Sequence, residues 1–354
     1  MAAAGAAFGR ANVAAVYLVH GTFCGNDLLG VLTELARVAP NLSEKLRKLS
    51  KGTMDLVLGE TGNYTRGVAG RMERDLSAGA GRTMPVVRFN WSSQNTHIAR
   101  ADGAVRLIDE LVRCAADISG NQNADLSPRI LLWAHSHGGN VLALITNLLG
   151  GDLASRREFF DAARPFYRNR ANRSAFPAWQ RVEEILLAGG NPLGNIALDL
   201  VTFGTPIRYG WETAGYTKLL HFDNHRPLSA GGDWLAPYPP PLFRVLTASA
   251  GDFVQQIGIA GSGFPPNPIA WRTFAANRRL RRLVARDAPY WLLTNLKAGA
   301  RVPDEGPTLL VDYADPAHTP LRHLFGHACY TRSRWMPLHC ELVAREMYDD
   351  FSSG

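Results

Sequence analysis

The chain has 354 residues, of which 46% are hydrophobic and 19% are charged, a balance typical of globular proteins with one large core. Its net charge of +7 comes without any nucleic-acid-binding motif, so we expect no nucleic-acid partner. The densest basic cluster, Arg278-Arg279-Leu280-Arg281-Arg282, indicates a solvated helix face. No run of 18 uncharged apolar residues predicts a helix that spans a membrane.

The cysteines and the N-terminal segment favour a cytoplasmic location. The first nine residues are rich in Ala and Gly, and the basic Arg10 follows them instead of preceding an apolar segment, as it would in a secretory signal. The cysteines show no C-x-x-C spacing, so we expect reduced thiols. They are Cys24, Cys114, Cys329 and Cys340.

Short apolar runs alternate with helical patterns along most of the chain. Strands are expected at 13–19, 85–91, 130–133, 198–203, 243–247 and 308–313. Helical periodicity is clearest at 28–35, 104–112, 141–148 and 337–348. This alternation predicts an α/β protein with a doubly wound, mostly parallel sheet. The Pro-, Trp- and Gly-rich connection 207–242 is interpreted as a surface excursion.

Two long segments interrupt this alternation within what we expect to be a single domain, residues 1–354. Residues 151–195 and 253–305 carry many aromatic residues without a clear strand pattern. We interpret both as helical insertions that form a cap or lid over an apolar pocket.

The segment 129–149 has the order strand, tight turn, helix. Its turn is Ala134-His135-Ser136-His137-Gly138, and apolar residues follow at helical spacing. This is the context of a nucleophile elbow, in which a strained turn exposes a serine Oγ, although Ala134 replaces the first glycine of the usual Gly-x-Ser-x-Gly pattern. The alternative interpretation of Ser136 is an ordinary helix N-cap.

A nucleophilic serine needs an imidazole base and a carboxylate that orients the base. Asp252 lies just beyond the strand expected at 243–247, and the order serine, acid, histidine is that of α/β-hydrolases. Glu212 is the main alternative acid, and Asp223 and Asp233 are further rivals. The histidines that follow Asp252 are His318, His323, His327 and His339.

An oxyanion hole needs two backbone N–H donors near the nucleophile. The amide of His137 is the first candidate, and the amide of Thr22 is the second, with Phe23 as its fallback. Pocket candidates are His20, Phe23, Trp91 and His135. Because His20, His135 and His137 lack the spacing of a known zinc motif, we expect no metal.

Three segments resemble the lipase/esterase branch of the α/β-hydrolase superfamily: Val19-His20-Gly21-Thr22-Phe23, Ala134-His135-Ser136-His137-Gly138-Gly139 and Phe203-Gly204-Thr205-Pro206. The resemblance implies the α/β-hydrolase fold and acyl transfer to water through an acyl-enzyme, without a metal or organic cofactor. It also favours His327, in a Gly-His turn, as the base, with His339 as the alternative.

The expected function is therefore that of a serine hydrolase acting on a small-molecule or lipid ester through Ser136, Asp252 and His327. An acyltransferase using the same residues and a non-catalytic, hydrolase-like binding module are the alternatives. The sequence leaves open the acyl chain, the alcohol, the oligomeric state and any peripheral contact with a membrane.

Overall fold

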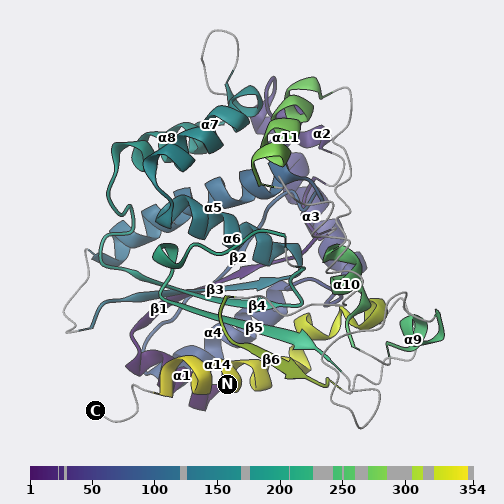
Figure 1. Ribbon diagram of the computed structural model, residues 1–354. Coiled ribbons are helices and arrows are strands. Elements are labelled where there is room, and N and C mark those ends of the chain that lie inside the picture. Colours follow the sequence, from purple (N-terminus) through teal and green to yellow (C-terminus); the bar gives the residue numbers. More distant parts are fainter. Residues whose placement is uncertain are drawn as a thin grey trace.

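Six parallel strands form one sheet in the order β2-β1-β3-β4-β5-β6 (Figure 1). The computed structural model describes residues 1–22, 24–27, 30–119, 126–168, 176–206, 208–225, 242–248, 251–259, 270–284, 305–313 and 323–349. The strands are β1 (Val13–Val19), β2 (Val86–Phe89), β3 (Arg129–His135), β4 (Ala197–Phe203), β5 (Lys218–Asn224) and β6 (Thr308–Val311). The α/β class and the parallel sheet expected from the sequence are confirmed.

Helices cover both faces of the sheet (Figure 1). On one face lie α5 (His97–Ser119) and α6 (His137–Gly150), and α7 (Leu153–Tyr167), α8 (Pro177–Ala188) and α11 (Trp271–Val284) pack outside them. On the other face lie α1 (Ala2–Arg10), α4 (Arg66–Ala80) and α14 (Met336–Tyr348). The remaining helices are α2 (Val31–Leu35), α3 (Pro40–Leu58), α9 (Leu242–Thr247) and α10 (Phe253–Ile259), with short 3₁₀ turns η1 (Thr213–Gly215), η2 (Leu324–Gly326), η3 (Cys329–Thr331) and η4 (Ser333–Trp335).

The central strands are apolar on both sides, because each face of the sheet has its own core. In β3, Ile130 and Leu132 belong to the core under α5 and α6, whereas Leu131 and Trp133 belong to the core under α1, α4 and α14. Strands buried on both faces form continuous apolar runs in the sequence. This explains why the strand at 130–133 was evident from the sequence.

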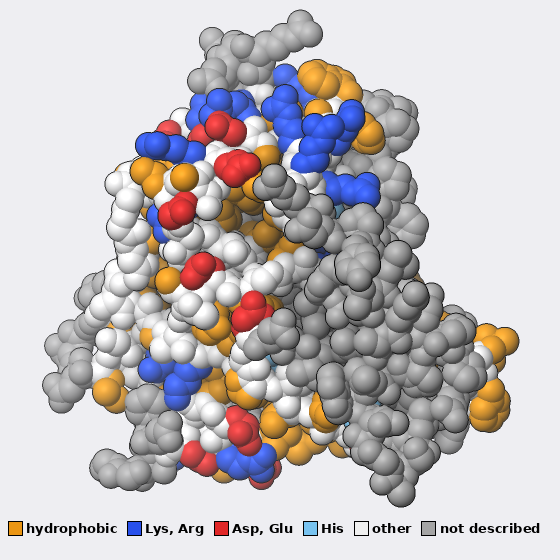
Figure 2. All heavy atoms as spheres, viewed as in Figure 1, with side chains coloured by type: hydrophobic (Ala, Val, Ile, Leu, Met, Phe, Trp, Pro, Cys, Tyr) orange, Lys and Arg blue, Asp and Glu red, His pale blue; other side chains and the backbone are white. Residues whose placement is uncertain are grey.

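The two insertions contribute an outer helical layer. Helices α7 and α8 occupy 151–195, and α11 lies within 253–305 and packs on α7 and α5. The four arginines at 278, 279, 281 and 282 of α11 are exposed, as expected of a solvated helix face, and Figure 2 shows basic side chains gathered where α11 lies. The lid role stays a prediction, since most of 253–305 lies outside the described residues.

The strand expected at 243–247 is wrong. Residues 243–247 are helical, within α9, and the true strand β5 lies inside the supposed excursion 207–242. A short apolar run such as that of α9 fits a strand or a buried helix equally well. Strand β5 was hidden because it buries polar side chains, among them His221, whose Nδ1 lies 2.6 Å from Thr202 Oγ1.

Among the described residues, no helix is both long enough and apolar enough to cross a membrane.

Candidate active site

The order of the strands places a topological switch point between β1 and β3. The chain leaves β1 toward β2 at one edge and leaves β3 toward β4 on the opposite side. Connections that depart in opposite directions open a crevice outside the carboxyl ends of the strands, where α/β proteins bind ligands. The loop after Val19 and the turn after His135 meet at this point.

Ser136 occupies a strained turn between β3 and α6. Its backbone has φ 55° and ψ −134°, and its side chain makes no capping hydrogen bond. The loop after β4 holds this turn: Ser136 N–H donates to Phe203 O at 2.9 Å, and Thr205 Oγ1 donates to Ser136 O at 2.9 Å. Strain of this kind persists only where the surroundings enforce it, and it clusters at functional sites. The geometry fits a nucleophile elbow better than an ordinary N-cap.

Gly21 brings the loop after β1 against Ser136. A Cβ atom at Gly21 would lie 2.6 Å from Ser136 Cβ and 3.2 Å from Ser136 Oγ. A similar close approach occurs at Gly138, where a Cβ would lie 2.8 Å from the carbonyl oxygens of Val19 and His20. Glycine is therefore required at both positions for the loop and the elbow to touch.

The two oxyanion candidates flank this contact. His137 is the first residue of α6, so its N–H has no acceptor inside the helix. Thr22 follows Gly21 in a turn, and its Oγ1 is buried without a hydrogen-bond partner in the described part of the chain. Phe23, the fallback donor and a pocket candidate, lies outside the described residues.

His327 and Asp252 form a buried pair. His327 Nδ1 lies 2.6 Å from Asp252 Oδ2, and the two side chains are 5% and 0% exposed. The other carboxylate oxygen, Asp252 Oδ1, accepts the Gln255 N–H at 2.8 Å. With Nδ1 bonded to the carboxylate, His327 Nε2 is buried and has no hydrogen-bond partner among the described residues.

A tight loop brings His327 to this position. Leu324 and Phe325 have φ of 44° and 52°, and Gly326 has φ of 90°. A Cβ on Gly326 would overlap the carbonyl of Gly251, the residue before Asp252. Asn224 Nδ2 donates to Gly326 O at 2.8 Å, so the end of β5 fixes the same loop.

His135 lies directly beneath His327. Its Nε2 lies 3.1 Å from His327 O, and the two ring centroids are 4.5 Å apart. Burial, together with His327, lowers the pKa of His135 well below its ordinary value. Because His135 directly precedes Ser136, this contact places the His327 loop beside the end of β3.

His20 and Trp91, both pocket candidates, pack behind the loop after β1. Their rings stack at 5.9 Å, and Trp91 Nε1 donates to His20 O at 2.8 Å. Burial and the nearby Lys51 lower the pKa of His20 to about 3. These side chains therefore support the loop as neutral groups.

His137 is also neutral at ordinary pH. Burial, followed by the charges of Arg100 and Arg208, lowers its pKa well below the usual value. Its Nδ1 lies 3.2 Å from Asn140 Nδ2, which also donates to Pro206 O at 2.9 Å.

The other described candidates have hydrogen-bond partners other than Ser136. His339 lies in α14, where Tyr313 Oη is 2.8 Å from its Nε2 and its ring packs on Phe203. Glu212 caps η1 and lies beside Thr146, near the far end of α6. His323 accepts the Gly326 N–H at 3.3 Å, and Asp223 accepts from Gln255 Nε2 at 2.7 Å. His318 and Asp233 lie outside the described residues.

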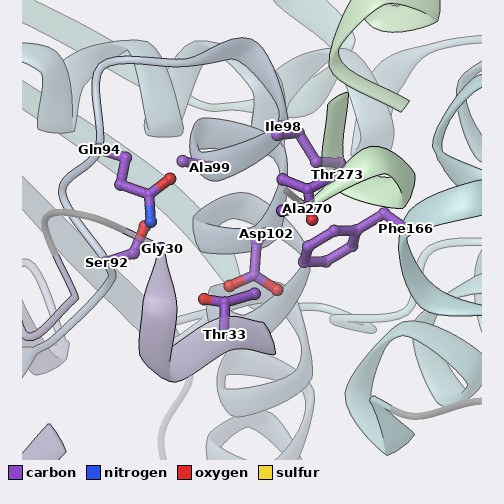
Figure 3. A pocket seen from close by; sticks show the side chains of 10 residues that line it. All are labelled: Gly30, Thr33, Ser92, Gln94, Ile98, Ala99, Asp102, Phe166, Ala270 and Thr273. Carbon is purple, nitrogen blue, oxygen red and sulfur yellow. The ribbon is translucent and has the colours of Figure 1, made fainter. Parts of the chain in front are cut away.

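The loop after Trp91 lines a small cavity rather than a substrate pocket. Figure 3 shows Thr33 of α2 and Asp102 of α5 pointing toward one another across it, with Phe166 of α7 on its wall. The cavity volume is about 20 Å³, which admits a water molecule but no acyl chain.

Sequence reasoning missed the groups that hold the site together. Gln255 binds Asp252, and Tyr330 Oη accepts the Asn224 N–H at 2.6 Å at the end of β5. The sequence carries no signal for Tyr330, since its partner is 106 residues away. The sequence Asp252-Phe-Val-Gln255 hints at an N-terminal helix cap, a signal that would have identified the Gln255 amide.

No family model, curated protein or solved structure matches the chain. In the described part of the chain, no group of three or more His, Cys, Asp or Glu side chains is arranged to hold a metal ion. The residues around Ser136, His327 and Asp252 are therefore the features that bear on function.

Proposed function

We propose that the protein is a serine hydrolase with the α/β-hydrolase fold that cleaves carboxylic esters through an acyl-enzyme on Ser136. The observation that carries the proposal is the buried 2.6 Å contact between His327 Nδ1 and Asp252 Oδ2, at the carboxyl edge of the sheet where the strained Ser136 turn lies. The contact leaves His327 Nε2 as the nitrogen that can accept a proton.

In the proposed reaction, Ser136 Oγ attacks the ester carbonyl carbon while its proton passes to His327 Nε2. Asp252 keeps the Nδ1–H tautomer and stabilises the imidazolium. The N–H groups of His137 and Thr22 stabilise the tetrahedral oxyanion. His327 then protonates the departing alkoxide, and a water molecule, deprotonated by His327, hydrolyses the acyl-enzyme.

Exposed apolar side chains beside the His327 loop support an ester with an apolar acyl chain. Leu242 and Phe243 of α9 are 73% and 75% exposed, and Leu246 is 42% exposed. Helix α9 contacts η2, the turn that directly precedes His327. An apolar acyl group leaving water would contact this surface favourably.

The nucleophile is tested by labelling the folded protein with a fluorophosphonate probe. The wild type should be labelled, and Ser136→Ala should abolish both labelling and hydrolysis of a short p-nitrophenyl ester. An unlabelled, folded wild type would contradict the proposal and favour a binding module. If an added alcohol captures most of the acyl group, the enzyme is an acyltransferase rather than a hydrolase.

The base is tested by comparing His327→Ala with His339→Ala. Loss of the base should lower kcat by about 10³-fold or more, with a smaller effect on KM. His339→Ala should reduce stability while leaving the kcat of the folded fraction near that of the wild type. The reverse pattern would assign the base to His339.

A further inference from the structure

A second cavity, of about 620 Å³, lies beside β2 and takes no part in the proposed reaction. Its walls come from α3, α4, α5, β2 and the loop after β1. The volume is in the range of small-molecule sites. Six cationic side chains line this basic cavity: Arg47, Lys48, Lys51, Arg66, Arg88 and Arg106.

The carboxylates near the basic cavity do not balance these cations. Asp55 is shared, because Lys51 Nζ lies 2.8 Å and Arg88 Nη2 lies 2.7 Å from its two oxygens. Lys48 pairs with Glu44 at 2.7 Å.

Two of the remaining cations form longer ion pairs. Arg47 lies 3.5 Å from Asp27, and Arg106 lies 3.8 Å from Asp102. Arg66 is exposed and has no ion-pair partner within the described residues. The lining of the basic cavity thus holds two carboxylates, Glu44 and Asp55, against six cations, and an excess of positive charge remains.

Unsatisfied polar atoms also lie in the walls of the basic cavity. Asn26 Oδ1, Asn90 Oδ1 and Arg106 Nη1 are buried and have no hydrogen-bond partner among the described residues. The Asn26 residue is only 8% exposed. Buried polar groups are normally paired, so several such atoms around one cavity indicate a polar ligand. The Asn26 amide, turned over, would present its NH₂ group as a donor.

We infer that the basic cavity binds the phosphate group of a phosphorylated ligand. A phosphate monoester carries about −1.5 to −2 charges near pH 7, which is complementary to the positive charge of this lining. Arginine offers paired N–H donors to phosphate oxygens, and the asparagine amides supply hydrogen bonds to the rest of the ligand.

The inner wall of the basic cavity is the back of the loop that carries Thr22. Lys51 Nζ donates to Cys24 O at 2.8 Å and to Asn63 Oδ1 at 2.8 Å, and Asn26 lies in the same loop. The bound phosphate would therefore lie behind the candidate oxyanion loop. The inference stands independently of the esterase activity, since it concerns binding alone.

The test is calorimetric titration of the full chain with inorganic phosphate and with glycerol phosphate, at an ionic strength held constant with sodium chloride. The wild type should bind both. Arg66→Ala should weaken binding at least tenfold without unfolding the protein, because Arg66 is exposed and lacks an ion-pair partner in the described structure. Arg88→Gln should weaken it further in the variant that remains folded.

Arg71→Ala is the matched control, since Arg71 is exposed on the same helix but does not line the basic cavity. Equal effects of Arg66→Ala and Arg71→Ala would mean that phosphate binds as an adventitious ion only, and would overturn the inference. The absence of binding at constant ionic strength would overturn it as well. Vesicles with and without phosphatidic acid identify the source of the phosphate. Binding confined to the acidic vesicles and lost in Arg66→Ala assigns the cavity to a lipid headgroup.

Discussion

Gly21 and Ser136 show the tightest fit at the scale of single residues, because the loop after β1 and the turn at Ser136 are in contact with no space between them. A Cβ at Gly21 would also lie 3.1 Å from His135 Nδ1. In the proposed reaction, a glycine at this position lets the loop that carries the candidate donor Thr22 lie against Ser136.

Replacing Gly21 by alanine should impair the site while leaving the fold intact. The new Cβ must push the loop away from Ser136, and a displacement of about 1 Å at a reacting centre costs on the order of 10²-fold in rate. The measurement is the rate of fluorophosphonate labelling, with circular dichroism to establish folding. Gly52→Ala is the control, since a Cβ there meets nothing within 4 Å. Equal labelling rates for both variants would contradict the assigned role of the loop.

At the scale of elements, a buried ion pair joins β3, β4 and α14. Both oxygens of Asp199 lie 3.0 Å from Arg129 Nη1, and Tyr348 Oη donates to Oδ2 at 2.9 Å. The Asp199 side chain is fully buried, and burial raises the pKa of its carboxyl group. The link fastens the C-terminal helix to the centre of the sheet, at the end opposite the crevice.

Removing only one partner of this pair should be costly. Arg129→Ala leaves a buried, uncompensated carboxylate and should lower the free energy of unfolding by about 3–5 kcal/mol, measured by urea denaturation. The double variant Arg129→Met, Asp199→Leu removes both charges, and its free energy of unfolding should fall clearly less than that of Arg129→Ala. If the double variant were as unstable as the single one, packing rather than charge would explain the effect.

At the same scale, strand β5 is the element that the sequence did not predict. Strand β5 carries His221, Asp223 and Asn224, so its sequence lacks the apolar run of a central strand. These side chains are acceptable in the sheet because each has a hydrogen-bond partner supplied by another segment. Such partners are invisible in a local sequence pattern, whereas β3 is apolar from Ile130 to Ala134 and is evident in the sequence.

At the scale of the whole molecule, several histidines are buried as neutral groups. Burial lowers the pKa of His339 to about 3 and that of His221 to about 4. The ordinary value is 6.5, so between the two values the unfolded chain binds a proton that the folded chain does not. The folded state therefore has no penalty from these neutral histidines above pH 6.5, and the free energy of unfolding falls as the pH drops from 6.5 toward their lowered pKa values.

The free energy of unfolding should therefore decrease on acidification from pH 6 to pH 4, by about 1.4 kcal/mol per pH unit for each such histidine. His339→Phe should reduce this slope by the contribution of one histidine, whatever its effect at pH 7. Tyr313→Phe is the control, since it removes the hydroxyl bonded to His339 but leaves the imidazole. An unchanged slope in His339→Phe would show that this histidine does not titrate in that range.

The sequence by itself determined the parallel α/β core, the elbow at Ser136 and the glycine-bearing loop after β1, because these features depend on neighbouring residues. It left open which acid and which histidine belong together. Only the tertiary structure decided that Asp252 meets His327, through contacts among Gly251, Gly326 and the end of β5. Segments 75 residues apart were brought together by long-range packing, which no local pattern encodes.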